Sequence, residues 1–409
     1  MKLRRALAGL PALGLLASGL AFAGPAGAAT LSCGDIITED TTLSADVGPC
    51  AGPFGLAIRA DNVTLDLGRF TVSGSAAEGD GAGILFDSVT GSTVRRGTVE
   101  GFDAGVVIRR GGGNTVERVL AQDNVQLGDG EFGDGILILS SSDNRVQSNT
   151  VLRNGRYSGI SIVSETDAND RISGPKPTGN VISGNTVRDN NLVFANMQVR
   201  IEGPGAEYNT VSRNLVSGND EFTEGGNHGI FIAASFNGFE ADAPILPLNP
   251  ANAFNDIVGN TVRENFNGSG MYVRARPLPT TNPHHNTIRR NFVTENGRHG
   301  IGIEGDPATE DRPAFGSFNN RVLDNRSVGN NVGGFEVAFD LTDFNPDCDE
   351  NRWFGNIYGT AQKPCVTVGG TQVEGVADVI GNVPESARDR LGYTDSVNAG
   401  GRLELAPPG

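Results

Sequence analysis

The sequence has few of the residues on which several common architectures depend. Lysine occurs three times, at Lys2, Lys176 and Lys363, and aromatic residues make up 6% of the chain. Beyond the N-terminal segment, no run approaches the roughly 20 apolar residues of a membrane-spanning helix, so we expect no membrane span. The 3.6-residue hydrophobic period of amphipathic helices is also missing, which argues for strands throughout.

The N-terminus has the features of a secretory leader. Basic residues at positions 2, 4 and 5 precede an apolar stretch and a segment of small residues. We expect cleavage after Ala28, although Ala21-Phe22-Ala23 is a second acceptable site. This predicts a signal peptide over residues 1–28 and a secreted, extracellular protein. Three of the 32 Lys and Arg lie in the leader, so 29 remain against 48 Asp and Glu, a net charge of −19. That charge argues against nucleic acid as a partner and favours cations or neutral ligands.

The four cysteines form two local pairs, Cys33 with Cys50 and Cys348 with Cys365. Four cysteines allow three pairings, and an oxidising compartment together with closeness in sequence favours these two. Each short loop would stabilise the fold by about 3 kcal/mol. Neither pair has Cys-x-x-Cys spacing, which argues against a metal site. We therefore predict one disulfide near each end of the mature chain.

An asparagine-rich repeat runs through most of the chain. Each copy begins and ends with Asn, alternates polar and β-branched residues between them, and in most cases has Asn at its middle. The copies begin at Asn114, Asn144, Asn180, Asn209, Asn255, Asn286 and Asn320, with a shorter one at Asn351. A Gly-hydrophobic-x-hydrophobic segment follows a short turn after each block, as in Gly135-Ile-Leu-Ile, except that Gln198 replaces the glycine in one copy.

The strand-like pieces of each copy are too short to bury an apolar side alone. If successive copies stack at about 4.8 Å, equivalent Val and Ile form continuous interior columns and every strand pairs in a parallel sheet. Asparagines at equivalent turns can then bond up and down the stack, so we assign them a structural role. A calcium-binding nonapeptide roll is the competing interpretation, but its Gly-Gly-x-Gly-x-Asp motif is missing from every copy.

These repeats resemble those of the right-handed parallel β-helix superfamily, the pectate-lyase-like proteins, and in particular NosD-like secreted repeat proteins. The resemblance covers about residues 55–360, and the segment from Cys33 to Thr38 also resembles the first coil of that group. It implies a single-stranded right-handed parallel β-helix of about ten coils. We expect an N-terminal cap over 29–55, the β-helix over 56–365, and a C-terminal cap or tail over 366–409. The superfamily contains lyases, hydrolases, epimerases and non-catalytic binders, so it names no substrate.

Several motifs of the enzymatic branches are missing. The Asp-Pro-His signature of alginate epimerases does not occur, nor do the Asn-Thr-Asp and Gly-His-Gly motifs of polygalacturonases. For a lyase, the resemblance implies calcium-binding acids and a Lys or Arg base. Because lysine is scarce, Arg274 or Arg200 would have to serve as that base.

Insertions interrupt the repeat on one side, and they indicate where function lies. They fall between a Gly-hydrophobic-x-hydrophobic strand and the next Asn block, whereas the other turns mostly stay short. The insertions are Ser164–Gly179, Glu202–Tyr208, Ala233–Phe254, Arg274–His285, Glu304–Asn319 and Ala338–Glu350. Long loops stacked along one edge would wall an elongated groove, and a groove of that shape suits a polysaccharide.

Aligning the Gly-hydrophobic-x-hydrophobic strands predicts two outward columns in this groove. The first contains Leu85, Val107, Leu137, Ser161, Arg200, Phe231, Tyr272, Gly302 and Glu336. The second contains Asp87, Arg109, Leu139, Val163, Glu202, Ala233, Arg274, Glu304 and Ala338. Both columns become polar or aromatic towards the C-terminus, so we predict substrate contacts at Arg200, Phe231 and Tyr272.

Candidate catalytic groups lie in the same region. Glu304 and Glu202 could be the carboxyl pair of a glycoside hydrolase, with Arg274 between them; the alternative is a surface ion-pair ladder. His228 and His299 share one register, with Asp134 in the equivalent place earlier in the stack. These histidines could act as general acid or base, or simply stack over the coil edge.

Other candidates are less specific. His284 and His285 are a weak metal pair, because adjacent side chains on an extended chain point apart. Acidic loop residues could bind calcium, although no known calcium loop is present and solvated loop charge is the alternative. They are Glu165, Asp167, Asp170, Asp306, Glu310, Asp311, Asp343, Asp347 and Asp349. Further sugar-stacking candidates are Phe236 and Phe239, whereas Trp353 takes a Val/Ile place in the last coil and is expected in the core or cap.

Two classes of function follow. One is a secreted carbohydrate-active enzyme, a hydrolase or lyase, that holds an extracellular polysaccharide in the groove; calcium is a possible cofactor. The other is a non-catalytic polysaccharide-binding or structural β-helix protein. Hydrolysis by carboxylates suits the negative charge slightly better than elimination, and the enzyme stands slightly ahead of the binder. We expect a monomer in either case.

Overall fold

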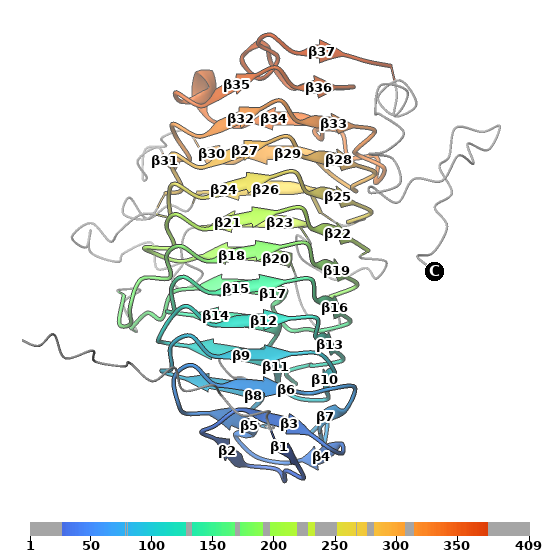
Figure 1. The fold of residues 1–409 in the computed structure, drawn as a ribbon. Helices are drawn as coiled ribbons and strands as arrows, with labels where there is room; N and C mark the ends of the chain where they lie inside the picture. The colour runs from blue at the N-terminus through green and yellow to red at the C-terminus, as the bar shows by residue number, and fades with distance from the viewer. Residues whose placement is uncertain are drawn as a thin grey trace, which may run out of the picture.

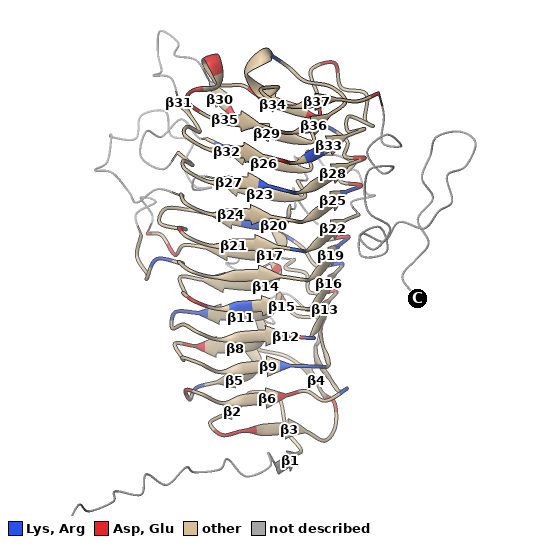
Figure 2. Cartoon of the chain, turned by 45° about the horizontal axis from the view of Figure 1, so that its top comes forward, with Lys and Arg blue, Asp and Glu red and all other residues tan. Residues whose placement is uncertain are grey.

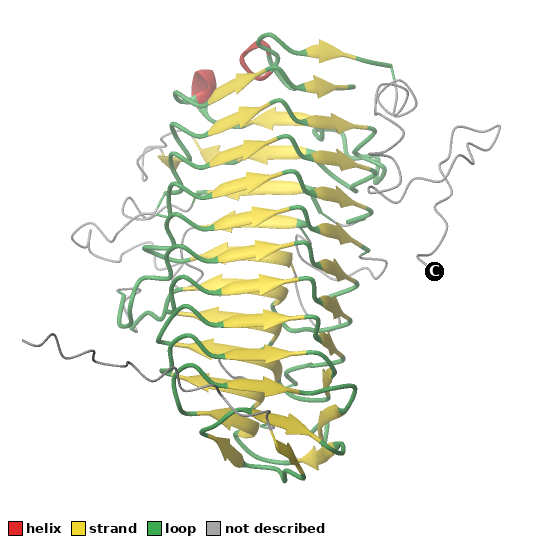
Figure 3. Cartoon of the chain, viewed as in Figure 1, coloured by secondary structure: helices red, strands yellow, loops and turns green. Residues whose placement is uncertain are grey.

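The computed structural model describes residues 27–77, 79, 81–127, 133–167, 172–190, 197–218, 228–233, 252–266, 268–275, 282–306 and 315–374. These residues wind into a stack of coils whose strands form three long parallel sheets (Figure 1). The predicted parallel β-helix is therefore confirmed. Strands of two to six residues and connecting loops account for almost all of it (Figure 3).

Sheet A has twelve strands: β1 (Gly27–Ala29), β3 (Thr41–Leu43), β6 (Thr64–Asp66), β9 (Thr93–Arg95), β12 (Thr115–Glu117), β15 (Arg145–Gln147), β18 (Val181–Ser183), β21 (Thr210–Ser212), β24 (Asp256–Val258), β27 (Thr287–Arg289), β32 (Arg321–Leu323) and β35 (Arg352–Phe354). Sheet C also has twelve: β4 (Val47–Cys50), β7 (Thr71–Gly74), β10 (Thr98–Glu100), β13 (Leu120–Gln122), β16 (Thr150–Leu152), β19 (Thr186–Arg188), β22 (Leu215–Ser217), β25 (Thr261–Arg263), β28 (Phe292–Thr294), β33 (Arg326–Val328), β36 (Ile357–Tyr358) and β37 (Thr371–Gln372).

Sheet B has eleven strands: β2 (Asp35–Ile37), β5 (Phe54–Ile58), β8 (Ala82–Asp87), β11 (Ala104–Arg109), β14 (Asp134–Leu139), β17 (Ser158–Val163), β20 (Met197–Glu202), β23 (Ile230–Ala233), β26 (Met271–Arg274), β29 (Ile301–Ile303) and β34 (Leu341–Asp343). A small hairpin, β30 (Gly305–Asp306) with β31 (Phe315–Gly316), and two 3₁₀ helices, η1 (Pro346–Cys348) and η2 (Pro364–Val366), complete the described elements. Among the described residues, no helix is long and apolar enough to cross a membrane.

Each coil runs through sheet A, sheet C and sheet B in that order, and the next coil pairs with it in register. Val94 of sheet A pairs with Val116, and Val116 pairs with Val146 in the coil above. From β9 onward, the middle residue of each three-residue strand in sheets A and C projects inward and is buried, so equivalent Val and Ile form columns. The core is therefore a narrow interior enclosed by the three sheets, as the repeat predicts.

From β9 onward, a two-residue turn joins each sheet A strand to the sheet C strand of the same coil. Its first residue has the left-handed conformation, with φ of +57° at Ser148 and +55° at Arg213. Its second residue is a buried asparagine in seven successive coils: Asn149, Asn185, Asn214, Asn260, Asn291, Asn325 and Asn356. Both the backbone N–H and the Nδ2 of each asparagine donate to Oδ1 of the next, at 2.9–3.0 Å. This ladder satisfies polar groups that the stack would otherwise bury unpaired.

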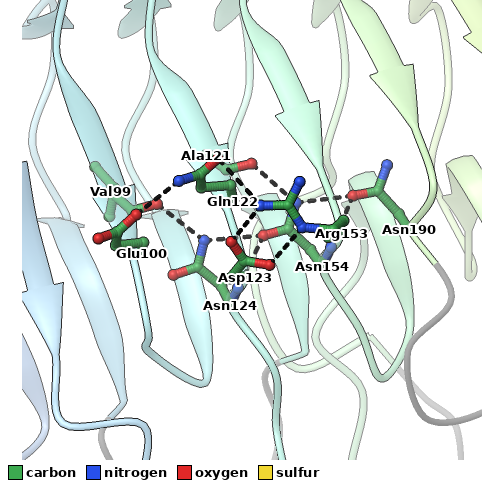
Figure 4. A network of polar contacts seen from close by, with 9 residues as sticks. All are labelled: Val99, Glu100, Ala121, Gln122, Asp123, Asn124, Arg153, Asn154 and Asn190. Carbon is green, nitrogen blue, oxygen red and sulfur yellow. Dashed lines mark hydrogen bonds and ion pairs between the residues drawn. The ribbon is translucent and has the colours of Figure 1, made fainter.

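Two further ladders follow the other corners. One runs from Asn114 to Asn351 before the sheet A strands. The third follows sheet C, and Figure 4 shows its first part, in which Asn124 donates to Asn154 and Asn154 donates to Asn190. The structural role predicted for the asparagines is confirmed at all three corners.

The exceptional Gln198 has a role in the third ladder. In most other copies this place is glycine; a Cβ on Gly229, for example, would run into the side chain of Val262. Gln198 instead places its Oε1 2.8 Å from Nδ2 of Asn190, which donates to it. The glutamine therefore supplies the acceptor that an asparagine supplies in the coils below.

Both predicted disulfides are present. Cys33 is bonded to Cys50 and Cys348 to Cys365, one near each end of the described stack. Trp353 is buried in the sheet A column above Val322, as expected, and its Nε1 donates to Asp343 at 2.9 Å. The predicted leader falls mostly on residues 1–26, and most of the predicted tail on 375–409; both segments lie outside the described residues.

The insertions need two corrections. The first five do lie where sheet B connects to the next sheet A strand, as predicted, but the sixth, 338–350, begins before β34 and contains that strand. In addition, the connections from sheet C to sheet B are long in several coils. These connections cover residues 123–133, 189–196, 218–229 and 329–340. The prediction that the other turns mostly stay short holds for the turn from sheet A to sheet C, whereas the connections from sheet C to sheet B are short in some coils and long in others. The strands of sheet B therefore have long connections at both of their ends in several coils.

Candidate functional site

The outer face of sheet B carries the two predicted columns of side chains. The register confirms the first column from Leu85 to Gly302 and the second from Asp87 to Arg274. Glu304 follows directly after β29, and its backbone N–H donates to the carbonyl of Val273 in the coil below.

The last position of each column is wrong. Thr342, not Glu336, pairs with Gly302, because the strand of this coil is β34. The segment from Gly334 to Val337 matches the Gly-hydrophobic-x-hydrophobic pattern, yet it forms an exposed loop, so Ala338 does not extend the second column. The ladder shows the true register, since Nδ2 of Asn330 donates to Asp340, immediately before β34.

The two halves of this face differ in chemistry. In the N-terminal half, outward side chains form an apolar cluster of Ala82, Ala104, Val107, Leu137 and Leu139, with Leu85 and Val163 against it. From Ser161 onward the first column turns polar and then aromatic. Figure 2 shows charged residues only at isolated places along the strands. The candidate site therefore lies on β17, β20, β23, β26 and β29.

Arg200 is the centre of a buried ion-pair cluster rather than an accessible contact. Its Nη1 lies 2.9 Å from Oε2 of Glu202, and its Nη2 lies 3.6 Å from Oδ1 of Asp134. Its Nε donates to Oγ of Ser161, and its guanidinium lies over the ring of Tyr157. Arg200, Glu202 and Asp134 are all buried, and burial raises the pKa of Asp134 although Arg200 opposes that shift. Two predicted site residues thus have structural partners.

Four aromatic or imidazole rings form a stack over β23, β26 and β29. The His228 ring lies 5.1 Å from Phe231 and 4.8 Å from Tyr272, nearly parallel to both. Tyr272 is followed by His299 at 6.2 Å. Phe231 is fully buried and Tyr272 has imidazoles on both faces, so neither ring presents a free face for sugar stacking. The other stacking candidates, Phe236 and Phe239, lie outside the described residues.

The two stacked histidines are held in the neutral form. Nδ1 of His228 accepts the backbone N–H of Ser269, and Nδ1 of His299 accepts that of Phe339. Burial lowers the pKa of His228 to about 3 and that of His299 to about 4. At neutral pH each ring therefore keeps its proton on Nε2 and has no free lone pair. This arrangement is poorly suited to general acid–base catalysis, which works best with a pKa near the operating pH.

Arg274 and Glu304 form the accessible part of the predicted site. Nε of Arg274 lies 2.9 Å from Oε2 of Glu304, and their side chains are 38% and 27% exposed. The predicted ladder of Glu202, Arg274 and Glu304 is divided, because Glu202 pairs with Arg200 in its own strand. Glu202 and Glu304 are three strand spacings apart, about 14 Å. A glycoside hydrolase needs its two carboxyl groups within about 9.5 Å, so these two do not make such a pair.

The acidic loop residues are dispersed. Glu165 bridges Arg109 and Arg110 at 2.7–2.8 Å, which fastens the 164–179 insertion to a lower coil. Asp343 is buried and accepts from Asn345, Asn351 and Trp353. Asp170, Glu310 and Asp311 lie outside the described residues. Within the described part of the chain, no group of three or more His, Cys, Asp or Glu side chains is arranged to hold a metal ion.

The comparisons with known proteins agree with the architecture. The family model of the right-handed beta helix region matches residues 55–180. Together with the three stacked parallel sheets, this match shows that the chain has the right-handed parallel β-helix fold. A search of curated proteins found no match.

Solved structures similar to this β-helix protein are distant in sequence. The Dettilon tailspike protein is 14% identical with a TM-score of 0.49, over 84% of this chain and 59% of the tailspike. A double mutant of a periplasmic alginate epimerase is 13% identical with a TM-score of 0.49, over 83% and 69% of the two chains. A mannuronan C-5 epimerase module from Azotobacter vinelandii is 13% identical with a TM-score of 0.45, over 86% and 90%. At these values, neither the substrate nor the activity of the three proteins carries over to this chain.

The predicted residues thus lie on one face of the β-helix, but only some of them are accessible to solvent. Arg200, Glu202, Phe231 and His228 are buried, whereas Arg274, Glu304 and the edge of Tyr272 are in reach of a ligand. Sequence reasoning placed Asp134 in the register of the histidines but missed its ion pair with Arg200. Asp134 and Arg200 lie two coils apart in columns that were aligned separately.

Proposed function

We propose that this protein is secreted and binds an extracellular polysaccharide on the outer face of sheet B, over β26 and β29. One observation carries the proposal: the half-exposed ion pair of Arg274 and Glu304 lies beside the stacked ring of Tyr272, whereas the outward side chains of β20 and β23 below it are buried. The pair offers N–H donors and carboxylate acceptors side by side, the combination that sugar hydroxyl groups need. A solenoid surface that repeats at about 4.8 Å suits an extended polymer.

Binding without cleavage is the function that the geometry favours. The histidines are neutral with Nδ1 occupied, and the two glutamates are too far apart for hydrolysis. Arg274 is held by Glu304, and burial raises the pKa of Tyr272, which leaves no basic phenolate at neutral pH. These observations support a non-catalytic binder over an enzyme.

Secretion is supported by the two disulfides, because such bonds persist in oxidising compartments. The leader-like residues 1–28 are consistent with it. The net charge of −16 argues for a neutral rather than a polyanionic polysaccharide.

The test is affinity electrophoresis of the mature protein through gels that contain neutral or acidic polysaccharides. Arg274→Ala and Glu304→Ala should each weaken binding about tenfold, the loss of one good polar contact. Arg289→Ala is the matched control. Arg289 forms a similarly exposed ion pair with Asp256 at 2.7 Å, but on sheet A, and its loss should leave binding unchanged.

Three results would overturn the proposal. The first is equal retardation of Arg274→Ala and Arg289→Ala. The second is no retardation of the wild type by any polysaccharide. The third is release of reducing ends or of unsaturated sugars that is lost in Glu304→Gln and His299→Ala, which would establish an enzyme instead.

A further inference from the structure

The two adjacent histidines of the sheet B to sheet A connection face each other. Nδ1 of His284 lies 2.9 Å from Nδ1 of His285, although the sequence predicts that neighbouring side chains point apart. The reason is the backbone, because His285 has φ of +55°. A left-handed residue reverses the alternation of an extended chain and brings its side chain to the same side as its neighbour.

Aromatic rings hold the pair from both sides along the stack. The Phe254 ring is perpendicular to the His284 ring, with centroids 5.9 Å apart, and its centroid lies 5.3 Å from that of His285. Phe318, one coil above, stacks on His284 at 5.1 Å. His285 is exposed and His284 is half-buried, so the two rings are ordered by contacts yet open to solvent.

Neighbouring coils show that the fold does not require histidine here. Ala253 and Phe318 occupy the place of His284 in the coils below and above. Phe254 and Asn319 precede ladder asparagines as His285 does, with φ of +58° and +54°. The left-handed backbone is thus common to the corner, and only the paired imidazoles are particular to this coil.

We propose that His284 and His285 bind a divalent transition-metal ion that prefers imidazole nitrogen, through their two Nδ1 atoms. Metal–imidazole bonds are about 2.0–2.1 Å long, so two nitrogens at right angles around an ion are about 2.9 Å apart. That separation matches the pair, whereas a tetrahedral angle would require about 3.3 Å. The geometry therefore points to an ion of square-planar or octahedral preference, such as Cu²⁺ or Ni²⁺.

The surroundings suit such an ion. Without metal, one Nδ1 must donate its proton to the other; on binding, the ion takes the place of that proton, which moves to Nε2 or to solvent. Solvent can fill the remaining coordination positions because His285 is exposed. The net charge of the chain, −16, attracts cations to the surface. The proposal does not depend on the polysaccharide site, which lies on the outer face of sheet B.

The experiment uses Cu²⁺ as the probe on the full mature protein and on two variants that copy adjacent coils. His285→Asn copies Asn319, which already has the left-handed backbone, and His284→Phe copies Phe318. Calorimetry should give one ion per wild-type chain, and each variant should bind at least about tenfold more weakly. Paramagnetic resonance should show two imidazole nitrogens on copper in the wild type and fewer in both variants.

The other two histidines provide an internal control. His228 and His299 are buried with Nδ1 occupied, so the double variant His284→Phe, His285→Asn should show no imidazole nitrogen at all. Copper held only by carboxylates or the terminal amine in the wild type, or equal affinity in wild type and variants, would overturn the proposal. If a variant failed to fold, the nitrogen count of the wild type would decide alone.

Discussion

The turn from sheet A to sheet C and the outer face of sheet B belong to the same coils, yet they vary to very different degrees. At the turn, a left-handed residue and a buried asparagine recur from Asn149 to Asn356 with hydrogen bonds of 2.9–3.0 Å. On the outer face, the residue changes at every coil, from Val107 through Arg200 to Tyr272. The stacking geometry is the same in both places.

Stacking therefore restricts the residue type at the turn and leaves it unrestricted on the outer face. An asparagine at the turn must accept from the coil below and donate to the coil above, so its neighbours fix its identity. A side chain on the outer face meets no such repeating partner. Such a side chain can therefore take part in local packing, as in the Arg200 cluster, or contact a ligand, as we propose for Arg274.

The largest effect is expected from Arg200→Ala. The substitution would leave Asp134 and Glu202 buried without their cation, which destabilises by about 4 kcal/mol. Guanidinium unfolding of wild type and variant measures the loss. Arg188→Ala, at an exposed arginine of β19, is the control and should change stability by about 0.5 kcal/mol or less. A loss below about 1 kcal/mol in Arg200→Ala would mean that the outer face contributes little to stability.

Acid should destabilise the outer face through its histidines. Burial lowers the pKa of His299 from 6.5 to about 4 in the folded chain, so the unfolded chain binds the proton more tightly. Stability is fully present above pH 6.5 and is lost as pH falls, by about 3 kcal/mol from this residue at pH 4. His228 adds a loss of the same sign.

His299→Ser, which copies Ser269 of the coil below, isolates the contribution of His299. Buried carboxyl groups whose pKa values are raised, such as Asp134 and Asp340, act in the opposite direction, but they are common to both proteins. As pH falls from 6.5 to 4, the wild type should therefore lose more unfolding free energy than the variant. Parallel pH profiles would show that His299 is solvated in the folded chain.

Breaking one rung of a ladder should have a somewhat smaller effect. Asn260→Ala removes the acceptor of two Asn214 donors and a donor to the carbonyl of Val211, all buried. Unpaired buried groups of this kind cost about 2 kcal/mol after local relaxation. Thermal or guanidinium unfolding should show that loss. A neutral result would mean that water replaces the amide, and that the uniformity of the turn has another cause.

Much of this arrangement could be predicted from the residues, because stacking imposes period and identity. The ladders, the core place of Trp353 and the register of sheet B up to Gly302 follow from the repeated pattern, and both disulfides follow from the closeness of each cysteine pair in the sequence. The prediction failed at Glu336, where a segment matched the strand pattern before the real strand. The ladder partner Asp340 was the better guide, because it has to accept from Asn330.

Accessibility could not be predicted in the same way. Alternation tells which side of a strand Arg200 or Phe231 projects from, but not what lies over that side, and both are buried. The sequence did not predict that the His284 and His285 side chains face each other, because adjacent side chains point apart on an extended chain. The signal was present, since Gly113, Asp143 and Gly179 hold the same corner position in other copies and such residues favour a left-handed backbone.

The smallest effect on stability is expected for Arg274→Ala, in the column next to Arg200. Its ion pair with Glu304 is half-exposed, so its loss should cost about 0.5 kcal/mol or less in guanidinium unfolding. If Arg200→Ala lowers the unfolding free energy far more than Arg274→Ala does, and only Arg274→Ala weakens polysaccharide binding, the two arginines have different roles. Arg200 then stabilises the fold, and Arg274 contacts the ligand. A loss at Arg274 as large as that at Arg200 would instead make both arginines part of one structural cluster and leave the proposed binding surface without its main contact.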